Sequence, residues 1–345
     1  MSKRIQISDD SGATWSTFPG DKGDMTRTAS DIKDTIFGAD YESGQTGIIS
    51  WNVSCNGVFK GFAGYVTKIL KSGTPTTFTA SAFSLVSGKT YKITDATKNI
   101  WDRTTAVTVY DNAVAVASNN ILSIDYLFGR VTFTSGYTPT GPITASGKYL
   151  PMTAVAGANG FTLTQTANAV DQTDYATAQA NGGFRAYQIG LRTVKLALKG
   201  FYDAANGFEA LLLARPELIV EIDVDGGGKN IARGWFKPLS VGQSGNVGEL
   251  EDASIDFALS VPSQADISLP FKWLIDSTST LSAALQKALT HYQTGNAIEI
   301  NYLADGTTGW QGDAIITDLS LTGGLDVMND FTIKFQGSDA PVAYP

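Results

Sequence analysis

Several short segments of this sequence contain residue types that carry out chemistry in other proteins. SGKT at 87–90 ends like a phosphate-binding loop, but that loop needs an earlier glycine so that backbone N–H groups converge on the phosphates, and Phe83 stands there instead. GQSGN at 242–246 is similar to the turn that presents a nucleophilic serine, but Asn246 occupies the position of its second glycine. We therefore expect an ordinary turn at both places.

The remaining candidates for chemistry are isolated carboxyl, imidazole and thiol groups. Asp223 and Asp225 lie beside glycines in a partial calcium-loop pattern, but the glutamate that closes such a loop is missing, so we expect a hairpin tip. His291 falls near the end of a predicted helix, where an imidazole complements the helix dipole, and Cys55 alternates in phase with apolar neighbours. We therefore expect no enzymatic activity, no cofactor and no metal site.

The composition favours a β-rich globular chain with many turns. The 345 residues are 43% hydrophobic and 17% charged, and 36 of them are glycine. The net charge of −8 argues against a protein that grips nucleic acid or an anionic membrane through its overall field. The N-terminus lacks the apolar run of a signal peptide and no membrane-spanning apolar stretch occurs, so we expect no membrane partner.

Internal repeats determine the expected domain organisation. Three pairs of segments are similar to each other: 218–261 and 296–339, 26–38 and 164–176, and 48–57 and 191–200. The first pair aligns without a gap and places Glu221 opposite Glu299. The chain is therefore predicted to hold two copies of one fold, each in two halves.

Hydrophobic periodicity predicts the elements of each copy. LIVEIDV at 218–224 and AIEINYL at 297–303 alternate with period two, which is typical of half-buried strands. Helical spacing predicts one helix per copy, at 205–215 and at 279–292. We expect Ser279 or Thr280 to cap the start of the second helix and Gly295 to cap its end.

The copies are predicted to be nested. Residues 1–74 complete the first copy together with 266–345, and 148–265 form the second copy between them. Residues 75–147 match neither half and alternate as short strands, so we expect a small inserted β module. Which half pairs with which is left open by the sequence.

Three segments carry no clear pattern: 1–30, 43–47 and 177–183. They are polar and rich in glycine. We expect them to be flexible loops, or to become ordered against a neighbouring molecule during assembly.

The ends of the two halves resemble a known family. GWQGDAIITDLSLTGGLDVMNDFTIKFQGSD at 309–339 and IKDTIFGADYESGQTGIISWNVSCNG at 32–57 are similar to segments of the major tail tube proteins of long, flexible-tailed, siphovirus-type bacteriophages. With the second copy, the resemblance covers all but the 75–147 module. It implies a mainly β fold, with two copies of a β-sandwich or partly closed barrel flanked by a helix.

The resemblance also implies a function in the virion. Family members assemble into six-domain rings that stack into a tube for DNA, so a chain with two copies would form trimeric, pseudo-hexameric rings. The expected partners are other copies of this chain and the tape-measure, tail terminator and tail-tip proteins, with DNA passing through unbound. Such a protein is made in the cytoplasm of the host bacterium, and its inserted module would project outward from the tube.

The polar strand faces provide candidate lumen residues. Glu221, Asp223 and Glu299 share the polar sides of the predicted strands, and a negative wall would repel phosphates and keep DNA mobile. We therefore expect these three carboxylates to line the lumen.

Two other functions remain open at this point. One is the tube subunit of a contractile secretion-type system, which shares the general fold. The other is a receptor-binding or carbohydrate-binding β protein of a phage tail, in which Trp101, Tyr110 and Tyr137 of the insert would form an exposed platform.

Overall fold

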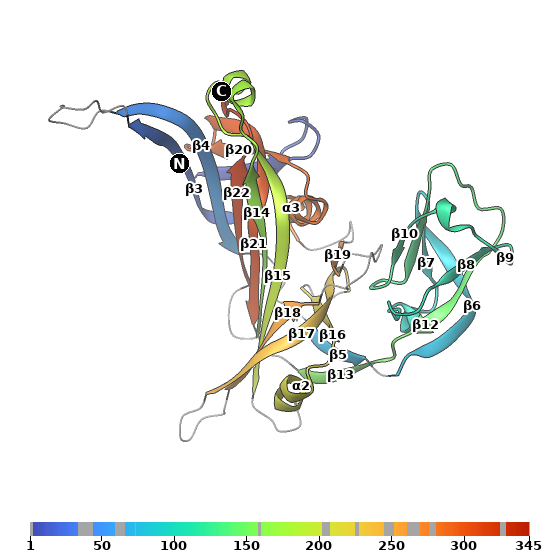
Figure 1. Cartoon of the computed structure of the whole chain (residues 1–345). Coiled ribbons are helices and arrows are strands. Elements are labelled where there is room, and N and C mark those ends of the chain that lie inside the picture. The colour runs from blue at the N-terminus through green and yellow to red at the C-terminus, as the bar shows by residue number, and fades with distance from the viewer. Residues whose placement is uncertain are drawn as a thin grey trace.

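The described residues form two antiparallel sheets of very different size. The computed structural model describes residues 3–33, 44–58, 66–72, 74–157, 160–201, 208–224, 228–244, 252–260, 270–275, 281–324 and 329–344. One sheet has 16 strands and the other has seven. Figure 1 shows the large sheet as a long, bent layer with the smaller sheet beside one end of it. The prediction of a mainly β fold is confirmed.

The large sheet takes strands from both ends and from the middle of the chain. Its strands from the N-terminal part are β1 (Arg4–Ser8), β2 (Ser16–Thr17), β3 (Gly20–Lys33), β4 (Gly44–Val58) and β5 (Val66–Ser72). Those from the middle are β13 (Met152–Gly157), β14 (Gly160–Asp171), β15 (Tyr187–Phe201), β16 (Leu218–Asp223), β17 (Asn230–Ser244), β18 (Asp252–Leu259) and β19 (Phe271–Ile275). Those from the C-terminal part are β20 (Ile298–Leu303), β21 (Gly309–Gly324), β22 (Asp330–Gly337) and β23 (Val342–Tyr344).

Two sets of strands within this sheet pair in the same order. One set runs β3, β4, β22, β21, β20, β1, and the other runs β14, β15, β18, β17, β16, β5. Corresponding ladders also shift at equivalent places: between Ile316 and Asp318 in β21, and between Pro238 and Ser240 in β17. Each shift bends its strand, as a bulge does, so the two sets bend alike.

The gapless alignment of the repeats is wrong in one hairpin. In the gapless alignment Ala314 corresponds to Phe236, and Ile298 corresponds to Val220. Ile298 of β20 does lie opposite Ala314, but the residue opposite Phe236 is Leu218 and not Val220. Strand β20 is therefore displaced by two residues. Since side chains alternate with period two, the displacement keeps every residue on its expected face, but it removes the equivalence of Glu221 and Glu299.

Two strands pair outside the predicted grouping. β5 hydrogen-bonds to β16 and β13, and β19 hydrogen-bonds to β17, so both lie among strands of the predicted second copy. β1, β3 and β4 pair with β20 and β22 as the prediction requires. The domain boundaries themselves stay predictions.

Among the described residues there are three α-helices: α1 (Tyr175–Ala180), α2 (Phe208–Ala214) and α3 (Ala283–Thr294). α2 packs on β17, and α3 packs on β1, β19 and β21. The apolar face of α3 is buried in the main core, as its spacing predicted. The helix begins later than predicted, so its N-cap is Ser282, whose Oγ accepts from the Leu285 N–H at 3.3 Å. The predicted caps Ser279 and Thr280 lie outside the described residues. Gly295 ends α3 with a φ of 79°, which confirms the predicted C-cap.

The seven-stranded sheet is formed by the insert. Its strands are β6 (Thr76–Ser87), β7 (Thr90–Ile93), β8 (Thr108–Asp111), β9 (Val114–Ala115), β10 (Ile121–Asp125), β11 (Arg130–Phe133) and β12 (Ile143–Tyr149), with short 3₁₀ turns η1 (Ala96–Lys98) and η2 (Ser118–Asn120). SGKT is the turn between β6 and β7, as expected. Most aromatic rings of the insert, Trp101 and Phe133 among them, pack into a core of the insert's own.

The N-terminal segment is ordered within the single chain. Residues 1–30 were expected to stay flexible or to wait for a neighbouring molecule, but β1 pairs with β20 and β3 pairs with β4. Ile5 and Ile7 are buried in the main core. The burial of these two side chains explains why this polar segment folds without a neighbour.

Candidate functional site

The two strand sets are joined edge to edge inside the chain. Strand β14 pairs antiparallel with the C-terminal part of β21, from Gly160 opposite Gly324 to Thr166 opposite Asp318. Leu163 lies opposite Leu321 on the core side, and both side chains are 0% exposed. The two sets therefore share one continuous sheet and one core.

A polar row crosses this junction on the opposite side of the sheet. Its directly opposed residues are Thr193, Thr166, Asp318, Lys334, Ser54 and Asp24, on β15, β14, β21, β22, β4 and β3. All six are exposed or half-buried. Lys334 Nζ lies 3.0 Å from Asp318 Oδ2, and the hydroxyls of Thr166 and Thr193 lie 2.6 Å apart. This surface is hydrophilic and carries both signs of charge.

Several strand edges of the large sheet are unpaired among the described residues, and two of them lie on the long strands β3 and β17. In the described part of the chain, β3 pairs with β4 alone, and residues 240–244 of β17 pair with β18 alone. Met25 of β3 and Val241 of β17 are only partly buried against the core. An unpaired edge exposes backbone N–H and C=O groups, so these are the places where another chain can add.

Two of the three predicted lumen carboxylates lie elsewhere. Glu221 and Asp223 are 8% and 7% exposed, so the expectation that they face a water-filled lumen is corrected. Arg233 Nε donates to Glu221 Oε2 at 3.0 Å, and the Gly228 N–H donates to Asp223 Oδ2 at 2.7 Å. A buried carboxylate needs such partners, because losing its hydration is costly.

The insert explains this burial. A separate apolar cluster joins Ile219 and Trp235 of the large sheet to four residues around the insert: Ile100, Leu127, Phe128 and Leu150. The Arg233 guanidinium also donates to the main-chain oxygen of Leu127, and Arg103 forms an ion pair with Glu217. The polar face of β16 is thus covered by the insert and not by solvent.

Glu299 lies in a different environment. Its side chain is half-buried and accepts a hydrogen bond from Gln311 Nε2. Nearby, burial raises the pKa of Asp339 to about 6, and repulsion from Asp313 and Glu299 adds to this. The lumen role of Glu299 stays a prediction.

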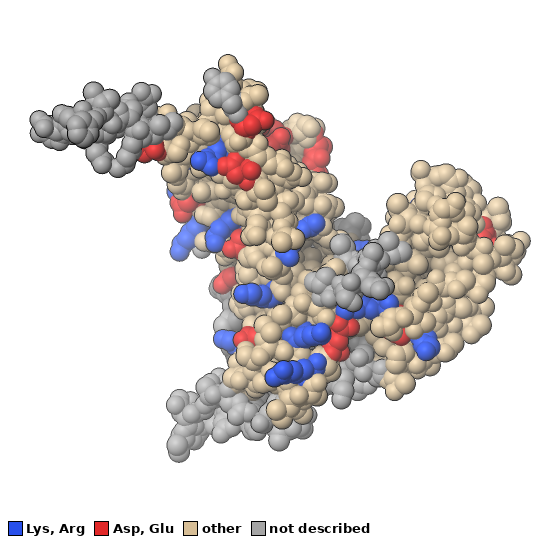
Figure 2. Space-filling view, in the orientation of Figure 1, with Lys and Arg blue, Asp and Glu red and all other residues tan. Residues whose placement is uncertain are grey.

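The insert aromatics do not form the expected platform. Trp101 is 0% exposed, which corrects its assignment to the surface, because its ring stacks on Phe78 with centroids 5.8 Å apart inside the insert core. The Tyr137 hydroxyl donates to Asp111 Oδ2 at 2.8 Å, and Tyr110 is half-buried. In the space-filling view, charged atoms are scattered over the large sheet, while the visible face of the insert is almost free of them (Figure 2).

The other chemical candidates have structural partners. Cys55 is buried, and His291 Nδ1 lies 3.1 Å from the Ala297 oxygen. Asp225 and Asn246 lie outside the described residues. Among the residues that the structure places, no three potential ligands gather into a metal site. No helix within the described ranges is long and apolar enough to span a membrane.

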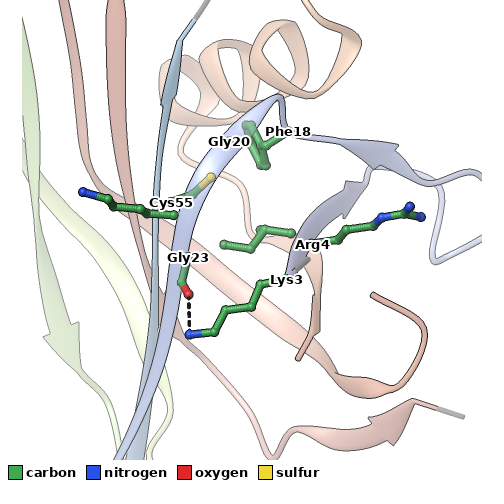
Figure 3. A pocket seen from close by; sticks show the side chains of 8 residues that line it. Lys3, Arg4, Phe18, Gly20, Gly23 and Cys55 are labelled. Atoms are coloured by element: carbon green, nitrogen blue, oxygen red, sulfur yellow. Dashed lines mark hydrogen bonds between the residues drawn. The ribbon is translucent and has the colours of Figure 1, made fainter. Parts of the chain in front are cut away.

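A small cleft separates β1 from β3. Lys3, Phe18, Gly20 and Cys55 are among the residues that line it (Figure 3). Its volume of ≈ 20 Å³ has room for about one water, far less than a ligand pocket of roughly 300 Å³ or more. Lys3 Nζ donates across the cleft to the Gly23 oxygen at 3.3 Å, so this carbonyl of β3 already has a partner.

Similar chains occur in several solved structures, among them two from gene transfer agent particles. The chain is 19% identical to a chain in the tail of an empty GTA particle computed with helical refinement and C6 symmetry; the likeness covers 32% of this chain and 84% of that chain, with a TM-score of 0.28. It is 15% identical to a chain in the virion of a native gene transfer agent (GTA) particle, over 35% of this chain and 88% of that chain, with a TM-score of 0.28. No family model and no curated protein matches the sequence.

Proposed function

We propose that this protein is a structural subunit of a phage-type tail tube and has no catalytic role. The observation that carries the proposal is the junction of β14 with β21, where two similarly ordered strand sets already form one continuous sheet. A tube wall requires this kind of repeated edge-to-edge addition. Three such chains would supply six strand sets, which gives a trimeric, pseudo-hexameric ring that stacks into a siphovirus-type tube.

In this proposal the lumen wall is the polar row. Its hydroxyl groups and its paired charges are accessible to water, and they offer DNA no cluster of cations to bind. The insert covers Ile219 and Glu221 of β16, a strand that the polar row does not cross, so we place the insert on the outside of the ring, away from the lumen. Tape-measure, tail terminator and tail-tip proteins would be the partners inside and at the ends of the tube.

Negative-stain electron microscopy of the purified protein at increasing concentrations tests this function. We expect rings or tubes with threefold symmetry and six similar lobes. Single particles at every concentration, including in the presence of isolated tail tips that would nucleate a tube, would overturn the proposal. Binding to a sugar array without assembly would instead support the receptor-binding alternative.

A further inference from the structure

We propose that β3 of one chain pairs antiparallel with residues 240–244 of β17 in a second copy of the chain, in the register of the internal β14–β21 junction. The proposal rests on the self-assembly proposed above and specifies its contact. It assigns the free edges of β3 and β17 to one interface, and it names the residues that meet there.

The internal junction provides the template because its two strands have counterparts at the free edges. β14 corresponds to β3: both pair with the next strand of their set, and both ladders shift at the same repeat position, between Ala167 and Ala169 and between Ala29 and Asp31. β21 corresponds to β17, which carries the equivalent shift at Pro238 and Ser240. Inside the chain β14 adds to β21, so β3 has the geometry to add to β17.

The free edge of β17 lies on the matching side. In β21, residues 309–314 pair with β20, and residues 318–324 then pair with β14, while β22 pairs with residues 314–322. In β17, residues 231–236 pair with β16 and residues 236–244 pair with β18. Among the described residues, the place corresponding to β14 beside 240–244 has no strand.

Burial at the edges indicates the same missing neighbour. Leu163 and Leu319, on the two strands of the internal junction, are both 0% exposed. Their repeat counterparts Met25 and Val241 also lie against the core, but they are only half-buried. A strand added to each edge would bury the rest of these side chains, which favours association.

The internal register fixes the pairs of the proposed interface. The counterparts of Thr162–Thr322, Thr164–Ser320 and Thr166–Asp318 are Asp24–Ser244, Thr26–Gly242 and Thr28–Ser240. In this register Asp24, which ends the polar row on β3, lies opposite Ser244 of the next chain. Lys3 already occupies the carbonyl of Gly23, so the pairing begins at Asp24.

The two edges differ, so the interface is head to tail. Two chains related by a twofold axis cannot satisfy both edges, because β3 meets β17 and not another β3. A row of chains joined in this way keeps one free β3 edge and one free β17 edge, until the first and the last chain pair with each other and close a ring. A ring of three chains would contain three internal junctions that alternate with three junctions between chains. Because both kinds of junction have the same geometry, the ring is pseudo-sixfold.

Disulfide crosslinking tests the register. In a T28C chain mixed with an S240C chain, both cysteines lie on exposed positions, and directly opposed residues fall within the Cα separation of about 4.4–6.8 Å that a disulfide requires. We expect disulfide-linked dimers in the mixture and none in either variant alone. The double variant T28C/S240C, which carries both cysteines in one chain, should give covalent trimers. The matched control is T26C with S240C, displaced by two residues or roughly 6.6 Å along the strand, which should not link.

The outcomes separate the interface from the function. Rings or tubes without a T28C–S240C link, or with a T26C–S240C link instead, overturn this register and leave the tube function standing. Links in the proposed register without rings or tubes support the interface and contradict the tube. Absence of both assembly and links overturns both.

Discussion

Lys272 of β19 and Asp125 of the insert form an ion pair that connects the two sheets, with Nζ 2.6 Å from Oδ2. The same carboxylate accepts from the Leu127 and Phe128 N–H groups at 3.1 Å each. One side chain thus shapes the turn that docks on the large sheet and also attaches to that sheet. The insert is therefore part of the folded body and not a tethered appendage.

Removing the two partners of this pair should have unequal effects. Asp125→Ala leaves two buried N–H groups without an acceptor and should lower the free energy of unfolding by about 2–4 kcal/mol. Lys272→Met removes a partly exposed charge and should cost under about 1 kcal/mol. Urea unfolding of both variants measures the difference. Equal effects would show that the ion pair, and not the turn, dominates.

Arg233 should be required for stability only when Glu221 is present. Arg233→Met leaves the buried Glu221 carboxylate without its cation and should destabilise the protein by about 3–5 kcal/mol. The double variant R233M/E221M removes both charges and should recover most of that loss. Protease cleavage within the insert reports the loss of docking, because Arg233 also contacts Leu127. Failure of the double variant to recover would contradict this account.

Close packing around Trp51 makes Gly337 intolerant of a side chain. A Cβ added at Gly337 would lie 1.9 Å from Cε2 of Trp51, which is 2% exposed. Gly337→Ala should therefore cost about 3 kcal/mol or more. The control is Gly136→Ala, where the added Cβ meets nothing within 4 Å, and thermal unfolding compares them. A G337A protein as stable as G136A would overturn the packing described here.

Asp339 should make stability fall as the pH rises through 4–6. Burial raises the pKa of its carboxyl from 3.8 to about 6, so the folded state binds a proton that the unfolded state has released in this range. The stability contributed by the protonated form is therefore present near pH 4 and lost above pH 6. Because solvent screens this partly buried group, we expect the free energy of unfolding to fall by only roughly 1 kcal/mol between pH 4 and 6.

The substitution Asp339→Asn tests this pH dependence. It retains the oxygen that accepts from the Asp313 N–H at 3.0 Å and removes the titration. Chemical unfolding at several pH values should give a flatter profile for D339N than for the unmodified protein. Identical slopes between pH 4 and 6 would exclude Asp339 as the titrating group.

A positive charge in the polar row should slow DNA passage without preventing assembly. Thr193→Lys places a cation on an exposed position of this row, where it would attract phosphates, and added salt should relieve the effect. The matched control is Thr79→Lys, on an exposed position of the insert. Particles assembled with each variant are compared for DNA release, and equal release would remove the polar row from the lumen.

The sequence predicts strands better than it predicts what covers them. LIVEIDV alternates as a strand exposed on one face, and it is a strand, but all six residues of β16 are buried because the insert packs on the polar face. Alternation reports a residue's own polarity and not a contact with a distant segment. Trp101 was misplaced for the same reason, since nothing nearby in the sequence shows that three rings, Phe78, Phe83 and Tyr126, enclose it.

Local signals were more reliable where they depend on backbone geometry. Gly295 at the end of α3 and Gly88 between β6 and β7 both adopt positive φ, as glycines at a helix end and a turn do. The two-residue displacement of β20 was missed because identical glutamates at 221 and 299 favour a gapless alignment.

The insert enters and leaves the large sheet through adjacent strands: Thr76 of β6 lies opposite Tyr149 of β12, and Ser72 of β5 lies opposite Met152 of β13. The module is therefore spliced into the tip of a hairpin whose arms remain paired. Any domain whose termini lie close together can replace it as a cassette, provided that it brings an apolar surface to shield Ile219 and Trp235. This gives an engineer a defined attachment point for display on the molecule.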